Sequence, residues 1–338
     1  MGRLSTLLAV LALAAAACGG NGGGEGDGKL TIYSGREQEL VEPLFDRFEE
    51  ETGIDVEVRY GDSAELAATI AEEGDNTPAE VFFAQDPGSL GAVEGAGLLA
   101  TLPDSILDRV DSRFRDPDGH WVGTSGRVRV VAYNTDELSP DELPDSILDY
   151  TDPKWKGKIG FPPTNASFQA FVSAMILERG EESTREWLQA IKANDPKLYE
   201  RNSQVVEAVA AGEVLAGFVN HYYLYLVKEE QPDAPVANDF LPGEDPGALV
   251  SVAGAGVIDG ADDEDEARRF VEFLLSDDAQ RFYVDEAEEA EYPLVDGIEP
   301  KSGLPPLADL QGPQIELDEL GPQLERTLEL LNEVGFTT

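Results

Sequence analysis

The sequence predicts an α/β protein of two lobes, with two long strands as a hinge and a cleft between the lobes. Strand-like and helix-like segments alternate from residue 29 onward, and the alternation restarts after a long strand at residues 127–135. A second long strand is predicted at residues 247–258. The chain has 338 residues, 41% of them hydrophobic, which is enough for two buried cores.

The first lobe is predicted to begin with an alternating strand at residues 29–35. Helical spacing of apolar residues then predicts a helix over 37–53, which Gly53 ends. A strand at 54–61, a helix at 63–74 with Ser63 as its N-cap, a strand at 79–85 and a helix at 87–97 follow. This β-α-β-α-β-α order indicates a mostly parallel sheet with helices on both faces.

The second lobe repeats this pattern. Strands are predicted at 158–163 and 214–220, and helices at 167–180, 183–194, 205–212 and 319–335. One continuous helix is predicted at 264–287. We assign residues 29–126 and 250–297 to the first lobe, and residues 127–249 and 298–338 to the second.

The N-terminus has the features of an export signal. Residues 1–17 carry one arginine and an apolar run too short to span a bilayer. Cys18, the only cysteine, follows this run and precedes a glycine-rich segment, so residues 18–28 are expected to be a flexible tether. We expect lipid on Cys18, as in bacterial lipoprotein signals, although Ala15 stands where leucine is usual. Plain cleavage near Ala17 is the alternative.

Charge limits the possible partners. The chain has 24 Lys+Arg and 68 Asp+Glu, a net charge of −44. This charge argues against nucleic acid and anionic membrane surfaces as partners, so membrane contact is expected only through the lipid anchor. The acidic residues spread along the whole chain, which indicates a solvated surface and suggests a salty environment.

Ligands of open parallel sheets bind at the carboxyl ends of the strands. The loops after Tyr33, after Phe83, around Pro163 and after Val219 are therefore the expected site. The last of these loops contains two adjacent tyrosines. Their spacing is compatible with a core aromatic cluster or with two oxygen donors facing a ligand. The loop at Pro163 leads into a helix start rich in Asn and Ser, which suits either ordinary capping or an anion.

Eight segments resemble the periplasmic ferric-ion-binding proteins, the substrate-binding subunits of iron ABC transporters. They occur in family order between Lys29 and about Val295: LTIYSGR, EEGDNTPAEVFFAQ, SGRVRVVAYNT, DPKWKGKIGFPPTNASFQAF, RNSQVVEAVAAGEV, VNHYYLY, DPGALVSVAGAGV and AEYPL. The resemblance implies a type II periplasmic-binding-protein fold that binds Fe(III) between the lobes, beside a synergistic anion such as phosphate or carbonate.

The resemblance also implies site residues. Tyr222 and Tyr223 match the family's two phenolate ligands. The family's histidine and glutamate ligands fall on Glu37 and Gln85, so this sequence departs from the pattern at both positions. The family's anion pocket matches Asn165, Ala166 and Ser167, with Asn202 and Asn220 nearby. A hard trivalent cation prefers such oxygen donors and favours the phenolate form of tyrosine.

Five further residues are weaker candidates. Arg127 and Arg129 alternate on one strand and both can face the cleft, with Arg127 as our candidate anion contact; pairing with surface carboxylates is the alternative. His221 precedes the tyrosine pair and is expected to point elsewhere. His120 is expected to be exposed, and Tyr225 to pack.

The resemblance and the export signal together imply a monomeric, extracytoplasmic, lipid-anchored protein that captures Fe(III) and passes it to an ABC transporter permease without catalysing a reaction. One alternative is a binder of an organic or phosphorus-containing solute, such as thiamine, a polyamine or a phosphonate, on the same fold. A secreted hydrolase is a second alternative, although no nucleophile and base set is evident. An acidic surface sensor or adhesion protein is a third.

Overall fold

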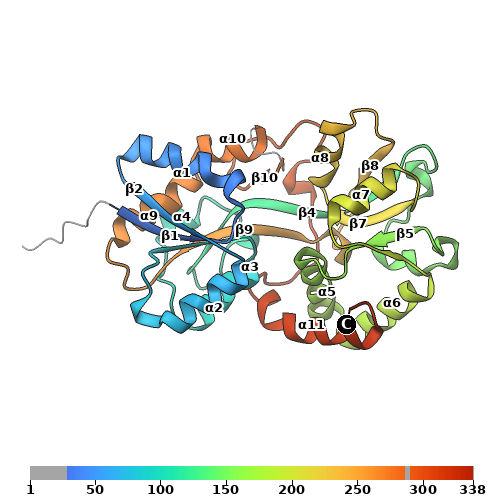
Figure 1. The fold of residues 1–338 in the computed structure, drawn as a ribbon, viewed down its shortest axis with the longest axis horizontal. Coiled ribbons are helices and arrows are strands. Elements are labelled where there is room, and N and C mark those ends of the chain that lie inside the picture. Colours follow the sequence, from blue (N-terminus) through green and yellow to red (C-terminus); the bar gives the residue numbers. More distant parts are fainter. Residues whose placement is uncertain (1–28, 286–289, 338) are drawn as a thin grey trace, which may run out of the picture.

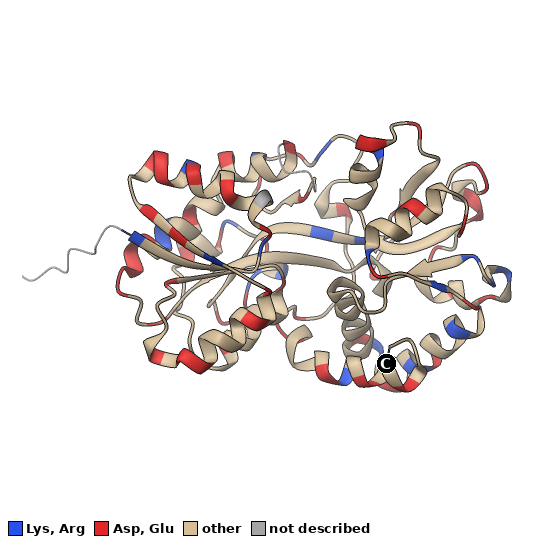
Figure 2. Ribbon diagram, viewed as in Figure 1, with Lys and Arg blue, Asp and Glu red and all other residues tan. Residues whose placement is uncertain are grey.

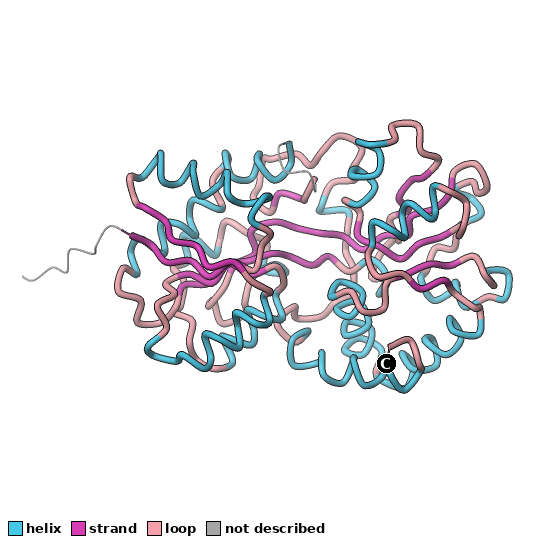
Figure 3. The backbone as a smooth tube through the Cα atoms, viewed as in Figure 1, coloured by secondary structure: helices cyan, strands magenta, loops and turns pink. Residues whose placement is uncertain are grey.

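A computed structural model describes residues 29–285 and 290–337 and shows two α/β lobes joined by long strands (Figure 1). The signal peptide at 1–17, the tether at 18–28 and lipidated Cys18 are predictions that lie outside the described residues. The strand order is β2-β1-β3-β9-β4-β7-β5-β6, and β8 and β10 also pair with β4. Strand β4 (Val122–Asn134) runs from one lobe into the other (Figure 3). The two-lobe α/β prediction is confirmed.

The first lobe is built around the sheet that contains the N-terminal half of β4. Its other strands are β1 (Lys29–Ser34), β2 (Asp55–Tyr60), β3 (Val81–Ala84), β9 (Val250–Val257) and β10 (Tyr292–Pro293). Its helices are α1 (Gln38–Thr52), α2 (Ser63–Glu73), α3 (Pro87–Gly95), α4 (Asp104–Leu107), α9 (Glu264–Leu274) and α10 (Asp277–Asp285).

Helix α1 shows how this lobe is held together. Its buried residues recur at helical spacing, and Gly53 ends the helix at a left-handed φ of 74°. The rings of Phe45 and Phe48 lie 5.6 and 5.1 Å from the ring of Phe270 in α9. Full burial of each such ring stabilises the fold by about 1.5–3 kcal/mol.

The second lobe surrounds the C-terminal half of β4. Its other strands are β5 (Ile159–Phe161), β6 (Lys197–Leu198), β7 (Ala216–Asn220) and β8 (Val236–Asp239). Its helices are α5 (Ala166–Arg179), α6 (Glu181–Ala193), α7 (Asn202–Ala210), α8 (Tyr223–Glu230) and α11 (Leu320–Val334). Stacked rings of Phe161, Phe168 and Phe218 join β5, α5 and β7 in one core. This packing fixes the starts of α5 and α8 relative to the sheet.

The sheet is less parallel than the sequence predicts. Strands β1, β2 and β3 pair in parallel, as do β5, β6 and β7. Strands β4 and β9, in contrast, are antiparallel to every strand with which they pair. The alternating βα units are present as predicted, but the two long strands run antiparallel to their neighbours in the sheet.

Two local predictions are wrong. The N-cap of α2 is Asp62, whose side chain accepts the N–H groups of Ala64 and Glu65, while Ser63 is the first helical residue. The helix predicted over 264–287 is two helices, α9 and α10. The Ser276 hydroxyl between them accepts the N–H of Ala279, so a new helix starts there with its own cap.

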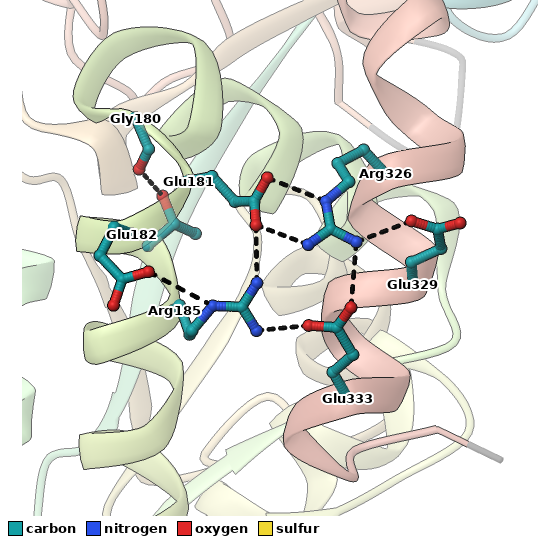
Figure 4. Close-up of polar contacts among 8 residues, drawn as sticks. Gly180, Glu181, Glu182, Arg185, Arg326, Glu329 and Glu333 are labelled. Atoms are coloured by element: carbon teal, nitrogen blue, oxygen red, sulfur yellow. Dashed lines mark hydrogen bonds and ion pairs between the residues drawn. The ribbon is translucent and has the colours of Figure 1, made fainter.

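Helix α11 lies against α5 and α6 of the second lobe and also reaches α3 of the first. Figure 4 shows the polar side of the contact with α6, where Glu181 accepts hydrogen bonds from Arg326 at 2.9 Å and from Arg185 at 2.6 Å. The segment before α11 contacts both lobes, because the Leu310 carbonyl accepts a bond from Arg113 and Gly312 donates one to Gly243. The boundary predicted at residue 298 stays a prediction.

Candidate functional site

Tyr222 and Tyr223 lie at the junction of β7 and α8. Tyr222 is the N-cap residue of α8, in right-handed helical geometry, and Tyr223 is the first helical residue. The Tyr222 hydroxyl donates to the Tyr223 hydroxyl at 3.2 Å, and the two ring centroids are 4.3 Å apart. Tyr222 is buried and Tyr223 is half-buried. The turn therefore brings two neighbouring phenolic oxygens together at the carboxyl end of β7.

Arg129 lies beside this pair. It faces Asn220 across the β4–β7 pairing, and its Nη1 donates to Asn220 Oδ1 at 3.3 Å and to Ser167 Oγ at 3.2 Å. The side chain is buried, which lowers the pKa of Arg129 to about 10, while Tyr222 and Tyr223 oppose that shift. Arg129 therefore remains a cation at neutral pH, between the phenolic oxygens and the start of α5.

The start of α5 is a cluster of amide and hydroxyl groups. Asn165 caps the helix: its Oδ1 accepts the Ser167 N–H at 3.0 Å and the Ser167 hydroxyl at 2.6 Å, and Ala166 is the first helical residue. Asn202 Nδ2 donates to Asn165 Oδ1 at 3.0 Å and to Ser167 Oγ at 3.4 Å. Among the described residues, the buried Oδ1 of Asn202 has no hydrogen-bond partner. A helix N-terminus next to Arg129 is a region of positive potential.

Glu37 and Gln85 lie in the first lobe, after the parallel neighbours β1 and β3. Glu37 is exposed at the N-cap position of α1, and its side chain does not cap the helix. Gln85 is half-buried, and its N–H donates to Ser63 Oγ at 2.9 Å. The structure places both at the carboxyl edge of the sheet, on elements separate from those that carry the tyrosines.

Arg127 lies away from the start of α5. Its Nε donates to Glu291 Oε1 at 2.6 Å, and its Nη1 donates to the Gln85 carbonyl at 2.5 Å. Glu291 is fully buried and holds this guanidinium in the first lobe. Arg129, two residues further along β4, is the arginine that lies beside Ser167, whereas the sequence prediction named Arg127.

In residues 29–285 and 290–337, no group of three or more His, Cys, Asp and Glu side chains is arranged to hold a metal ion. In the same residues, no helix is both long and apolar enough to cross a membrane. The two phenolic oxygens, with Arg129 and the start of α5 beside them, form the candidate site.

Residues 76–306 match a family of bacterial extracellular solute-binding proteins. The chain belongs to this family. It is 35% identical to the major ferric iron-binding protein of Neisseria meningitidis serogroup B, over 91% of this chain and 93% of that protein. It is 33% identical to the Fe(3+)-binding periplasmic protein of Serratia marcescens, over 99% of both chains.

Solved structures agree with this assignment. Iron-bound HitA from Pseudomonas aeruginosa superimposes with a TM-score of 0.82 at 35% identity, covering 91% of this solute-binding protein and 99% of HitA. A Trichodesmium FutA with iron and citrate ligands has a TM-score of 0.80 at 29% identity, covering 91% and 100% of the two chains. The predicted family resemblance is confirmed.

The histidines of this solute-binding protein have other partners. The fully buried His221 ring accepts the Val128 N–H at Nδ1, 3.2 Å away, and its Nε2 lies 3.1 Å from the Ala290 carbonyl. Both nitrogens are therefore used, and the His221 side chain points elsewhere, as expected. His120 is half-buried rather than exposed, since its ring contacts Asp116 at 3.1 Å. Tyr225 is half-buried and packs beneath Lys301.

Glu291 and His221 have structural importance that sequence reasoning missed. Glu291 is one of 68 acidic residues, and its only signal is its place in the AEYPL segment, which does not show that its side chain is buried. The signal for His221 was its position, since it directly precedes the tyrosine pair. The sequence does not single out Arg129 over Arg127, the named candidate, because residues two apart on a strand share a face and only the structure separates their partners.

Proposed function

We propose that this solute-binding protein captures one ferric ion between its lobes, with a synergistic anion, and delivers it to the permease of an ABC transporter. The observation that carries the proposal is the 3.2 Å separation of the Tyr222 and Tyr223 hydroxyl oxygens. Oxygens this close can contact one cation together. The relatives named as ferric iron-binding proteins and the iron-bound structure of HitA support the same cargo.

The chemistry of the proposed ligands suits a hard trivalent ion. Each phenol would lose its proton on binding, and the hydrogen bond between the two hydroxyls would be replaced by contact with the metal. The Arg129 cation favours charge on the neighbouring oxygens, because opposite charges at short range stabilise one another in a buried site. The two tyrosines thus supply the second lobe's half of the site.

The synergistic anion is assigned to the start of α5. Arg129, the Ala166 N–H and the side chains of Asn165 and Ser167 would hold phosphate or carbonate, with Asn202 orienting the Ser167 hydroxyl and Asn220 the guanidinium. Arg127 is left out of this proposed site, because it is bound to Glu291 and the Gln85 carbonyl.

The first lobe would complete the coordination with Glu37, whose exposed carboxylate can turn toward the ion. Gln85 offers only a neutral oxygen, so water or a second anion is expected to share its place. Closure of the lobes about the hinge strands would bring these groups to the tyrosines, and opening at the permease would release the ion. We assign no catalysis to this cycle, and the protein would act as an extracytoplasmic monomer anchored through lipid on Cys18.

Visible absorption tests the proposal directly. Purified protein mixed with ferric citrate is expected to develop a phenolate-to-iron charge-transfer band. Tyr222→Phe and Tyr223→Phe should each abolish or shift that band, because each removes one phenolate. Tyr225→Phe, on the same helix, is the matched control and should leave the band unchanged. A colourless wild-type protein that binds no iron would overturn the assignment and favour an organic or phosphorus-containing solute.

A further inference from the structure

The first lobe contains a buried cluster of charged side chains to which the proposed function assigns no role so far. We call it the Glu291 cluster, and it consists of Glu291, Arg36 and Arg127. Arg36 donates two bonds to the Glu291 carboxylate, at 3.2 and 3.1 Å, and Arg127 donates a third at 2.6 Å. All three side chains are at most 5% exposed. Moving three charges out of water raises the free energy of folding unless they are well paired, so a buried cluster of this kind is weak evidence of a stabilising role and suggests another one.

Each arginine of the cluster is connected to one of the two candidate ligands of the first lobe, Glu37 and Gln85. Arg36 directly precedes Glu37, so fixing its guanidinium fixes the backbone that carries this carboxylate. Arg127 Nη1 donates to the Gln85 carbonyl at 2.5 Å and so fixes the second position. One carboxylate therefore ties together two loops that are neighbours in space and about fifty residues apart in the sequence.

Ala290, the residue before Glu291, contacts His221 of the second lobe. The carbonyl of Ala290 lies 3.1 Å from His221 Nε2, and the other nitrogen of that ring accepts the Val128 N–H at 3.2 Å. Because Nδ1 accepts this N–H, Nε2 carries the proton and donates to Ala290. The backbone N–H of His221 also donates to the Val128 carbonyl at 2.9 Å. The turn that holds Tyr222 and Tyr223 is thus fastened to both the hinge strand and residue 290.

We propose that the Glu291 cluster and His221 form one positioning unit that sets the first-lobe and tyrosine halves of the iron site relative to each other. The inference rests on the proposed function, because it assigns the unit no ligand of its own. Groups that orient metal ligands from behind commonly change metal affinity by about 10–100-fold when they are removed. A purely structural role would instead predict lower stability with an unchanged metal site.

Two substitutions of His221 separate these possibilities. His221→Gln places an amide N–H near the position of Nε2 and can still reach the Ala290 carbonyl. His221→Asn places an amide oxygen near the position of Nδ1, which keeps the Val128 contact but is too short to reach Ala290. The Gln variant therefore keeps the contact to the Ala290 carbonyl, whereas the Asn variant keeps only the contact to Val128 of the hinge strand.

The measurements are the wavelength of the charge-transfer band and the rate at which a chelator removes iron, with thermal unfolding as the stability readout. We expect His221→Asn to shift the band and release iron about tenfold faster or more. His221→Gln should retain most of the wild-type spectrum and rate. Glu291→Gln should also shift the band and speed release, with exposed Glu299→Gln as its control.

The outcomes are distinguishable. If wild-type protein shows no band with ferric citrate, the proposed function fails and this inference fails with it. If wild-type protein shows the band and folded His221→Asn matches it in wavelength and release rate, the inference alone is overturned. Should Glu291→Gln fail to fold, the His221 pair still decides.

Discussion

Arg129 is a single side chain that serves two proposed ligands. Its guanidinium lies beside the tyrosine pair and donates to Ser167 and Asn220, so it would touch the anion and stabilise the phenolates. The guanidinium carbon lies 5.9 and 5.6 Å from the ring centroids of Phe168 and Phe171, and all three side chains are buried. Charge in such a dry environment acts more strongly than on the surface.

Replacing this cation should weaken iron retention. A hydrogen bond to a charged group contributes about 1.5–3 kcal/mol, which corresponds to roughly tenfold to a hundredfold in affinity. We therefore expect Arg129→Gln to bind iron at least about tenfold more weakly in a competition titration with a chelator. The loss should be larger with phosphate or carbonate present than without. Arg269→Gln on the exposed face of α9 is the control, and equal affinity of Arg129→Gln and wild type would contradict the role.

Asp239, at the end of β8, is a half-buried acid outside the site. Burial raises the pKa of Asp239 to about 6, and Asp145 adds to the shift. An unfolded aspartate has a pKa of about 4, so the folded state holds the proton more tightly. The contribution of this group to stability is therefore present below about pH 4 and is lost as the pH rises to about 6.

Removing that charge should stabilise the protein at neutral pH. We expect Asp239→Asn to raise the free energy of unfolding at about pH 7 by about 1 kcal/mol, after allowance for solvent screening. At about pH 3 the variant and wild type should be nearly equally stable, because the wild-type carboxyl is then mostly protonated in both states. Urea unfolding at both pH values measures this, with exposed Asp136→Asn as control. A variant less stable than wild type at neutral pH would refute the assignment.

At the scale of elements, two adjacent residues at the start of helix α2 have different roles, one in capping the helix and the other in positioning Gln85. Asp62 caps the helix through Ala64 and Glu65, whereas the Ser63 hydroxyl accepts the N–H of Gln85. Asp62→Ala should lower the free energy of unfolding by about 1 kcal/mol and leave the iron spectrum unchanged. Ser63→Ala should instead alter iron release, because it frees the Gln85 backbone. Chemical unfolding and chelator kinetics on both variants test this, and an exchange of the two effects would contradict it.

How far the sequence predicts these elements depends on how local their causes are. The helix of α1 follows from the spacing of its own apolar residues, and the tyrosine turn follows from two adjacent residues. The Glu291 cluster could not be foreseen, because Arg36 and Glu291 are 255 positions apart and meet only through the folded sheet. The direction of the long strands was not predicted for the same reason, since βα alternation indicates the type of an element but not its direction in the sheet.

At the scale of the whole molecule, negative charge is the dominant electrostatic feature. The net charge is −44, and Figure 2 shows acidic residues over the helices of both lobes. Like charges at this density repel one another, and folding brings them closer together. Local pairs such as Arg326 with Glu181 act in the opposite sense, but the chain has only 24 Lys and Arg for its 68 Asp and Glu.

Added salt should therefore stabilise this protein. The Debye length falls from about 10 Å at 0.1 M to about 3 Å at 1 M, which screens repulsion between surface carboxylates. We expect the urea midpoint of unfolding to rise between these two NaCl concentrations, because the screened repulsion outweighs the weakened ion pairs. Sucrose is the control, because it favours burial without screening charge. In variants with exposed acids replaced by lysine, the rise in the urea midpoint caused by NaCl should shrink. The rise caused by sucrose should stay the same in these variants. A midpoint unchanged or lowered by NaCl would mean that attractive pairs, and not repulsion, dominate the surface.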